Sequence, residues 1–192
     1  MIAIIKYNAG NIRSVQNALN RLGYDSTITD DKKEIENASK VIFPGVGEAG
    51  SAMRYLRDKQ LDTLIRSLRQ PVLGICLGLQ LMCSYSEESN TECLNIFNSQ
   101  VRFFPPGDKI PHMGWNNLSS MRGSLFKGIT EKNDVYFVHS YYAELSADTA
   151  AVCEYILPFS AAMQKDNFYA TQFHPEKSAG TGESILLNFL HI

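Results

Sequence analysis

Short apolar runs alternate with segments of helical spacing along the first 82 residues. The apolar runs, each the length of one strand, are residues 2–7, 24–29, 40–43 and 71–75. Between and after them, apolar side chains recur every three to four positions in the segments 12–22, 53–68 and 77–82. Strands that alternate with helices pair in parallel and carry helices on both faces of the sheet. The pattern therefore predicts an α/β fold on an open, mostly parallel, twisted sheet.

The rhythm changes after about residue 90. Short strand-like segments separated by turns then dominate, at residues 101–104, 134–143, 150–155, 160–164 and 168–173. This half of the chain is expected to add a strand-rich, partly antiparallel portion, and residues 182–190 are expected to close the chain as a helix. The 192 residues contain no internal repeat and no linker, so we expect a single domain over residues 1–192.

Composition excludes several classes of function. A net charge of −2 gives no electrostatic argument for binding nucleic acid or an anionic membrane. No apolar run approaches the roughly 20 residues of a membrane span, and the first run is expected to be a buried strand instead of a signal peptide. The four cysteines form no C-x-x-C pair, so reduced thiols in the cytoplasm are expected, with no metal and no cofactor.

One cysteine lies on a predicted turn that favours a reactive thiolate. Gly74, Cys76 and Gly78 form a G-x-C-x-G pattern where a predicted strand runs directly into a predicted helix. Flanking glycines let the neighbouring backbone approach at such a bend, and the helix N-terminus favours a thiolate. The amide of Leu77 is then available to an oxyanion. On this motif alone, a buried structural cysteine is an equally good interpretation.

A histidine and a glutamate supply the rest of a triad. His174 and Glu176 are separated by Pro175, which favours an extended residue 174. On an extended segment, residues two apart face the same side, so the carboxylate is expected to orient the imidazole that takes the thiol proton. The sequence therefore predicts the triad Cys76, His174 and Glu176. A Cys/His metal site is the weaker alternative, because it leaves Glu176 unexplained.

A G-x-C-x-G turn with a distant H-P-E resembles the class I, or triad, glutamine amidotransferases. The resemblance implies an open α/β sheet with helices on both faces. It also implies that the cysteine attacks the side-chain amide of L-glutamine, that ammonia leaves, and that water hydrolyses a γ-glutamyl thioester.

The glycine-rich segment 44–50 permits two interpretations. Gly45, Gly47 and Gly50 match the G-x-G-x-x-G of a dinucleotide site, but the segment does not follow the first strand and the next strand ends in Cys76, with no acidic residue for a ribose. The family resemblance implies instead that the P-G-x-G segment supplies a backbone amide to the oxyanion hole. The peptide between Val46 and Gly47 would then flip when the enzyme is activated. We expect residues 44–52 to form a loop.

Further stretches narrow the resemblance to one branch of the family. "YNAGN", "PHMGWN" and "YFVHSYY", together with "QFHPEKS", resemble the glutaminase subunits of imidazole glycerol phosphate synthase over essentially the whole chain. The departures are Lys6 in place of a common Asp, Asn8 in place of a common Gly, and Glu48-Ala49 in place of a small-aromatic pair. They bear on local docking and leave the triad untouched.

The resemblance also implies a set of substrate contacts. Gln80 matches a residue that contacts the bound glutamine, and Glu88 matches the carboxylate that receives its α-amino group. The backbone at Ser140 and Tyr141 matches the segment that holds the α-carboxylate. Taken alone, each has an ordinary structural interpretation, and the adjacent Glu87 leaves a shift of one residue open.

Released ammonia requires an acceptor, and the sequence carries no second domain that would use it. In the branch above, the partner is a cyclase subunit, a (β/α)₈ barrel that forms a heterodimer with the glutaminase. The resemblance implies that this partner meets Asn11, Met113, Trp115 and Lys177. A Met/Trp pair is otherwise more typical of a core. Three alternatives stay open: a glutaminase with another amidotransferase partner, a stand-alone cysteine hydrolase, and a catalytically silent binding subunit.

Overall fold

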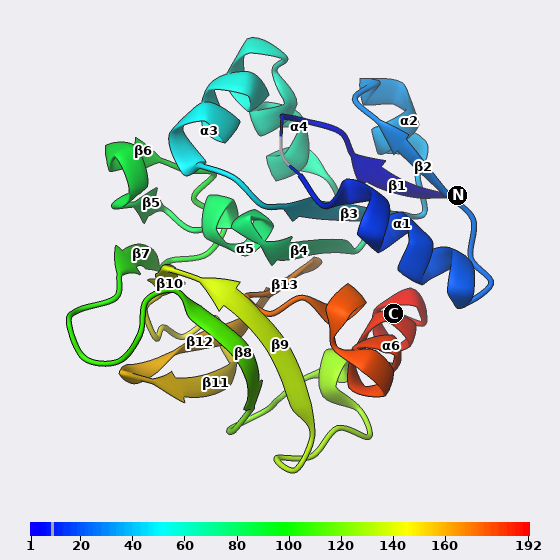
Figure 1. Ribbon diagram of the computed structural model, residues 1–192. Coiled ribbons are helices and arrows are strands. Elements are labelled where there is room, and N and C mark those ends of the chain that lie inside the picture. The colour runs from blue at the N-terminus through cyan, green and yellow to red at the C-terminus, as the bar shows by residue number, and fades with distance from the viewer. Residues whose placement is uncertain (9) are drawn as a thin grey trace.

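A seven-stranded sheet forms the centre of the protein (Figure 1). The structure is a computed structural model that describes residues 1–8 and 10–192, so Ala9 of the YNAGN stretch lies outside the described residues. In spatial order the strands are β11 (Thr149–Tyr155), β12 (Leu157–Lys165), β13 (Phe168–Thr171), β4 (Val72–Cys76), β3 (Lys40–Gly45), β1 (Ile2–Ile5) and β2 (Ser26–Thr29). The five strands from β13 to β2 pair in parallel, whereas β11, β12 and β13 pair antiparallel. The predicted sheet, mostly parallel with an antiparallel C-terminal portion, is confirmed.

Helices cover both faces of this sheet, as predicted. On one face, α1 (Ile12–Arg21) and α6 (Ala179–Leu190) pack in the same buried cluster as Ile4, Ile42 and Leu73. On the other face lie α2 (Lys32–Asn37), α3 (Ala49–Asp58), α4 (Leu61–Ser67) and α5 (Leu77–Met82). Successive strand residues point to opposite faces, so the parallel strands β1, β3, β4 and β13 contribute apolar side chains to both clusters, whereas the edge strand β2 is largely polar.

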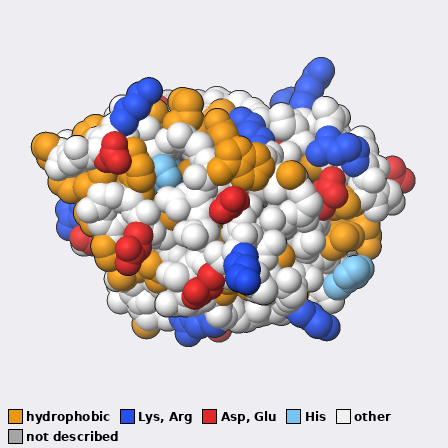
Figure 2. Space-filling view, turned by 60° about the horizontal axis from the view of Figure 1, so that its bottom comes forward, with side chains coloured by type: hydrophobic (Ala, Val, Ile, Leu, Met, Phe, Trp, Pro, Cys, Tyr) orange, Lys and Arg blue, Asp and Glu red, His pale blue; other side chains and the backbone are white. Residues whose placement is uncertain are grey.

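Residues 85–143 form two smaller sheets beside the main one. A ribbon pairs β8 (His112–Asn117) with β9 (Asp134–His139) in antiparallel register. The other sheet has the order β10 (Tyr141–Ala143), β7 (Gln100–Phe103), β5 (Tyr85–Ser86) and β6 (Thr91–Glu92). Short 3₁₀ turns lie at η1 (Glu88–Asn90), η2 (Ser124–Phe126) and η3 (Pro175–Lys177). Figure 2 turns the lower side of Figure 1 forward and shows hydrophobic patches interspersed with acidic and basic side chains.

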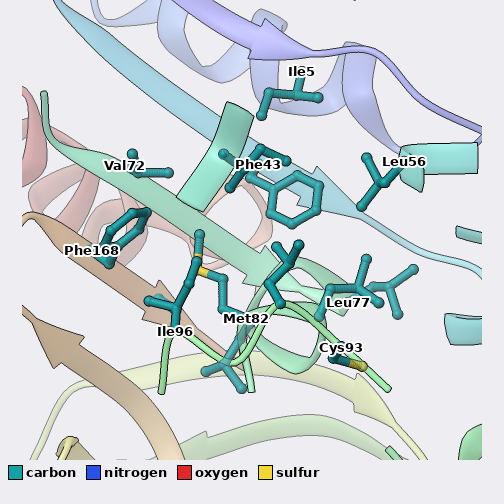
Figure 3. Packing of buried hydrophobic residues seen from close by; sticks show 14 of the residues in the cluster. Ile5, Phe43, Leu56, Val72, Leu77, Met82, Cys93, Ile96 and Phe168 are labelled. Carbon is teal, nitrogen blue, oxygen red and sulfur yellow. The ribbon is translucent and has the colours of Figure 1, made fainter. Parts of the chain in front are cut away.

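The core beneath α5 holds the end of β4 in place. Figure 3 shows Phe43 and Val72, from neighbouring strands, with Leu77 and Met82 of α5 on the same side of the sheet. All four side chains are at most 2% exposed. Burial of side chains of this size contributes roughly 1.5–3 kcal/mol each. The turn from β4 into α5 is therefore fixed by packing on both of its arms. Among the described residues, no helix is both long and apolar enough to cross a membrane.

Three predicted elements differ from the structure. The strand-like segment expected over residues 134–143 is divided at Ser140 into β9 and β10, which belong to different sheets. The helix expected over residues 53–68 is two helices, because Gln60 adopts a left-handed conformation (φ 55°) between α3 and α4. The loop expected over residues 44–52 is shorter, because Pro44 and Gly45 continue β3 and α3 begins at Ala49. The Glu48 carboxylate accepts hydrogen bonds from the amides of Gly50 and Ser51, an N-cap that the glycine-rich sequence conceals.

Candidate active site

Cys76 lies at the junction of β4 and α5 in a backbone conformation that ordinary residues avoid, with φ 54° and ψ −106°. Its two flanking glycines have a steric reason. A Cβ on Gly78 would lie 1.9 Å from the carbonyl oxygen of Phe43, and one on Gly74 would lie 2.9 Å from Met82 Sδ. The G-x-C-x-G pattern therefore allows the bend to pack directly against β3.

The structure brings His174 and Glu176 together in the interior. His174 Nδ1 lies 2.8 Å from Glu176 Oε1, and the two side chains are 1% and 0% exposed. Pro175 to Lys177 form the 3₁₀ turn η3, so the extended geometry expected for this segment is wrong beyond His174. The predicted contact forms across the turn instead.

The environment of His174 favours a charged imidazole. Burial alone would lower the pKa of His174, but the Cys76 thiolate and the hydrogen-bonded Glu176 carboxylate together raise it to about 10. Nδ1 is engaged with Glu176, and Nε2 is buried with no hydrogen-bond partner among the described residues. Nε2 is thus the ring nitrogen available to exchange a proton with the thiol.

Two amide side chains, those of Asn11 and Gln172, contact the triad, and the sequence did not predict either contact. Asn11 Nδ2 donates to Glu176 Oε1, so the Asn11 amide acts within the chain, whereas only a partner contact was expected for it. Gln172, fully buried, has its Nε2 3.6 Å from Cys76 Sγ. A glutamine in an otherwise apolar run two residues before the histidine was the available signal.

A pocket of about 290 Å³ opens in front of Cys76, and the predicted oxyanion residues Val46, Gly47 and Leu77 line it. Leu77 begins α5, where a backbone N–H has no partner within the helix. The Val46 carbonyl accepts a hydrogen bond from the Gly10 amide at 3.0 Å. Gly47 has φ 146°, a conformation that L side chains rarely adopt.

The predicted substrate contacts surround the same pocket: Gln80, Glu88, Ser140 and Tyr141. Gln80 Nε2 donates to the Tyr141 carbonyl at 3.0 Å and to Gln172 Oε1 at 3.1 Å, which joins the pocket wall to the amide beside Cys76. All four residues therefore lie where a substrate bound at Cys76 would contact them.

The structure separates the two adjacent glutamates. Glu87 lies 3.0 Å from Arg102 Nη1 and accepts the Phe103 amide at 2.8 Å, outside the pocket. Glu88 lines the pocket with Oε2 2.8 Å from the Ala49 amide, and burial raises its pKa. A cation in the pocket would contact Glu88 and not Glu87. Of the two adjacent glutamates, Glu88 is therefore favoured as the residue that receives the α-amino group.

Met113 and Trp115 are on the surface, 61% and 55% exposed, in contrast with the core position typical of such a pair. Trp115 packs edge-on against Tyr136, with ring centroids 5.9 Å apart. Lys177 Nζ lies 6.0 Å from the same Tyr136 ring. Two of the four expected partner residues, Trp115 and Lys177, thus lie against the Tyr136 ring, and Met113 is paired with Val138 in the same ribbon.

The alternative of a metal site gains no support. Among residues 1–8 and 10–192, no group of three or more His, Cys, Asp or Glu side chains is arranged to hold a metal ion. The four cysteines are all buried thiols without a disulfide. The site is instead a buried Cys-His-Glu set beside a pocket.

Comparison with known proteins agrees with this chemistry. The chain matches the family described as glutamine amidotransferase class-I over residues 3–192. It is 59% identical to an imidazole glycerol phosphate synthase subunit HisH from Bacteroides fragilis, over 100% of this chain and 99% of the relative. It is 44% identical to a protein of the same name from Haemophilus influenzae, over 98% of this chain and 96% of the relative.

Solved structures support the fold. A crystal structure described as a glutamine amidotransferase superposes with a TM-score of 0.75 at 18% identity, over 100% of this chain and 98% of the other. The structure of PurLQS from Thermotoga maritima superposes with a TM-score of 0.73 at 16% identity, over 99% and 97%. At these identities the likeness shows the fold alone.

Proposed function

The chain belongs to the class I glutamine amidotransferase family and, within it, to the HisH glutaminase subunits of imidazole glycerol phosphate synthase, and on that premise we propose how its residues carry out the reaction. It is an enzyme subunit of histidine biosynthesis. The observation that carries the residue assignment is the convergence of Cys76, the His174–Glu176 pair and the pocket at one end of the sheet.

Cys76 is the nucleophile. Its thiolate attacks the side-chain carbonyl carbon of L-glutamine, and His174 Nε2 gives the thiol proton to the leaving ammonia. A γ-glutamyl thioester remains, and water, deprotonated by His174, hydrolyses it to glutamate. Glu176 holds the imidazole through Nδ1, and Asn11 holds the carboxylate in turn.

The oxyanion of each tetrahedral intermediate is stabilised by backbone amides. We assign one to Leu77, at the start of α5, and one to Gly47. The peptide between Val46 and Gly47 is the switchable part, because a rotation exchanges the direction of the Val46 carbonyl and the Gly47 amide. The Gly10 hydrogen bond to the Val46 carbonyl stabilises one of the two orientations.

Glutamine binds by its two charged groups. The half-buried Glu88 carboxylate pairs with the α-ammonium group, and the backbone at Ser140 and Tyr141 receives the α-carboxylate. Gln80 supports the Tyr141 carbonyl from α5. The substrate is then held at its far end, which leaves its amide facing Cys76.

Ammonia passes to a cyclase subunit, a (β/α)₈ barrel that forms a heterodimer with this chain. The exposed Met113 and Trp115, with Lys177 beside them, support a docking face there, and Asn11 is assigned to its edge. The barrel joins ammonia to a phosphoribulosyl-formimino-carboxamide ribotide and yields imidazole glycerol phosphate and an aminoimidazole carboxamide ribotide. We place the single amidotransferase domain, residues 1–192, in the cytoplasm, in keeping with four unpaired thiols.

The test compares three substrates and two variants in the assembled complex. We expect glutamate release from L-glutamine and none from peptides or esters, with the activity lost in Cys76→Ala. Trp115→Ala is expected to weaken assembly, or to release ammonia into solution, while the triad still hydrolyses glutamine. Hydrolysis of peptides or esters at comparable rates would instead support a stand-alone cysteine hydrolase.

A further inference from the structure

Two histidines that the reaction above does not use lie buried beside the pocket. His112 opens β8 and His139 ends β9, and the two are directly paired in the ribbon. They are 4% and 6% exposed. His112 Nδ1 lies 3.0 Å from His139 Nε2, and His139 Nδ1 lies 2.7 Å from the carbonyl oxygen of Tyr141.

The positions of the protons on the two rings follow from the last acceptor, the carbonyl oxygen of Tyr141. A carbonyl oxygen only accepts, so His139 Nδ1 carries the proton. In a neutral His139, Nε2 then accepts, and His112 Nδ1 must be the donor. His112 Nε2 is left to accept from Asn116 Nδ2, which lies 3.4 Å away. The four groups form one chain of hydrogen bonds that all run in the same direction, from Asn116 to Tyr141.

The surroundings keep both rings neutral and fixed. His112 is stacked on the Tyr155 ring, with centroids 3.9 Å apart and planes at 15°. His139 packs against Phe104 and Phe159, at 5.2 Å and 5.1 Å. A charged imidazole would lose its hydration here and would turn the contact between the rings into two donors facing each other.

The chain of hydrogen bonds ends where the substrate is expected. The Tyr141 carbonyl is held by His139 and by Gln80, and the Ser140 carbonyl accepts the Phe104 amide at 3.1 Å. In a trans peptide the N–H points opposite to the C=O, so the Tyr141 amide faces away from Phe104. Ser140 and Tyr141 both line the pocket in front of Cys76.

We propose that His112 and His139 are positioning residues for glutamine: their one-directional hydrogen-bond chain fixes the Ser140–Tyr141 backbone so that it receives the α-carboxylate of the substrate. This inference rests on the proposed glutaminase function. Met113 directly follows His112 in β8. The chain of hydrogen bonds therefore begins next to the exposed Met113–Trp115 face and ends at the substrate site.

The first experiment needs no variant. Nitrogen-15 spectra of the imidazoles in the full chain at neutral pH report the tautomer of each histidine. We expect both His112 and His139 to be neutral with the proton on Nδ1, the less common tautomer. A proton on Nε2 of either ring, or a charged ring at neutral pH, would overturn the inference.

The second experiment separates substrate binding from chemistry in the assembled complex. His139→Phe keeps a ring but removes the donor to Tyr141, and we expect KM for glutamine to rise about tenfold or more, as for loss of a hydrogen bond that orders a charge-binding site. We expect kcat to fall by less than that. His139→Asn places an amide N–H near the position of Nδ1 and should recover most of the KM.

His112 provides a matched pair of variants. His112→Asn retains a donor to His139 Nε2 and should keep KM close to that of the unaltered chain, whereas His112→Phe should raise it. His191→Phe, at the exposed end of α6, is the control and should change neither constant. If the unaltered complex does not hydrolyse glutamine, the proposed function fails; if it does and KM is the same in all His112 and His139 variants, the positioning role is wrong.

Discussion

At the scale of single residues, the site is a set of polar groups buried around one thiol. Cys76 and His174 could be placed there from the sequence because a strained strand-to-helix turn and an H-P-E segment each have a local signature. Asn11 and Gln172 could not, because their roles arise from contacts across 165 and 96 residues of sequence. The partners of a long-range hydrogen bond cannot be identified from a single sequence, even where a polar residue in a largely apolar run, such as Gln172, marks one of them.

The triad should respond to substitution as a unit. His174→Ala is expected to reduce glutamine hydrolysis nearly as much as Cys76→Ala, because without the base the thiol is not activated. Glu176→Gln keeps the shape and loses the charge, so its effect on kcat should be smaller by about two orders of magnitude. Steady-state rates of glutamate release measure all three, and a fully active Glu176→Gln would remove Glu176 as the orienting group.

The four thiols should also differ in reactivity. Burial raises the pKa of Cys93 and of Cys153 to about 12, and raises that of Cys83 still further. Only Cys76 lies in the pocket beside a charged imidazole. A glutamine-analogue alkylating agent should therefore label Cys76 first, as peptide mapping by mass spectrometry would show. Labelling spread evenly over the four would contradict a selective thiolate.

At the scale of elements, the parallel strands and their helices could be predicted because the helices carry one apolar face at regular spacing and the central strands are short buried apolar runs. The break at Gln60 could not, because a left-handed conformation is uncommon for a residue other than glycine and glutamine gives no local signal of it. The start of α3 was hidden because Glu48 is an uncommon cap among glycines. Neither boundary follows from the spacing of apolar residues: one depends on a left-handed Gln60 and the other on the local cap by Glu48.

The bend between β4 and α5 has its own prediction. Gly78→Ala would place a methyl group 1.9 Å from the Phe43 carbonyl, so β3 and α5 must separate. We expect a loss of stability of roughly 1–3 kcal/mol or more, measured by urea unfolding. Gly180→Ala is the matched control, since nothing lies within 4 Å of the added Cβ there, and it should leave stability nearly unchanged. Equal stability of both variants would mean that the bend is less tightly packed than the structure indicates.

At the scale of the whole molecule, buried histidines should couple stability to pH. Burial lowers the pKa of His112 to about 4 and that of His139 to about 3, from an ordinary value of 6.5. The unfolded chain therefore binds protons that the folded chain rejects. The stabilising contribution is complete above pH 6.5 and declines as the pH falls toward 4, with uptake of about two protons on unfolding within that window.

Urea unfolding between pH 7 and pH 4.5 measures this uptake. His112→Asn should reduce it by about one proton, while His191→Phe removes a histidine from an exposed position and serves as the control. An uptake that His112→Asn leaves unchanged would show that His112 titrates normally in the folded protein.

In the whole molecule, the proposed glutaminase site is coupled to a partner. Hydrolysis without an acceptor would waste glutamine, and we propose that the Val46–Gly47 peptide is the element that turns between two orientations. Removing one oxyanion donor typically costs roughly 10²–10³ in rate, so a peptide turned by the partner supplies activation of that order. Gly47→Ala should reduce the activation, because φ 146° is unfavourable for alanine.

The most direct measurement is therefore the rate of glutamate release under three conditions: the chain alone, the chain with the barrel subunit, and the complex with its phosphoribulosyl-formimino-carboxamide ribotide. We predict a poor glutaminase alone and a rate higher by about 10²–10³ with barrel and ribotide together. Equal rates in all three conditions would contradict the account, because the loop would then be no switch and the partner would serve only as an acceptor of ammonia.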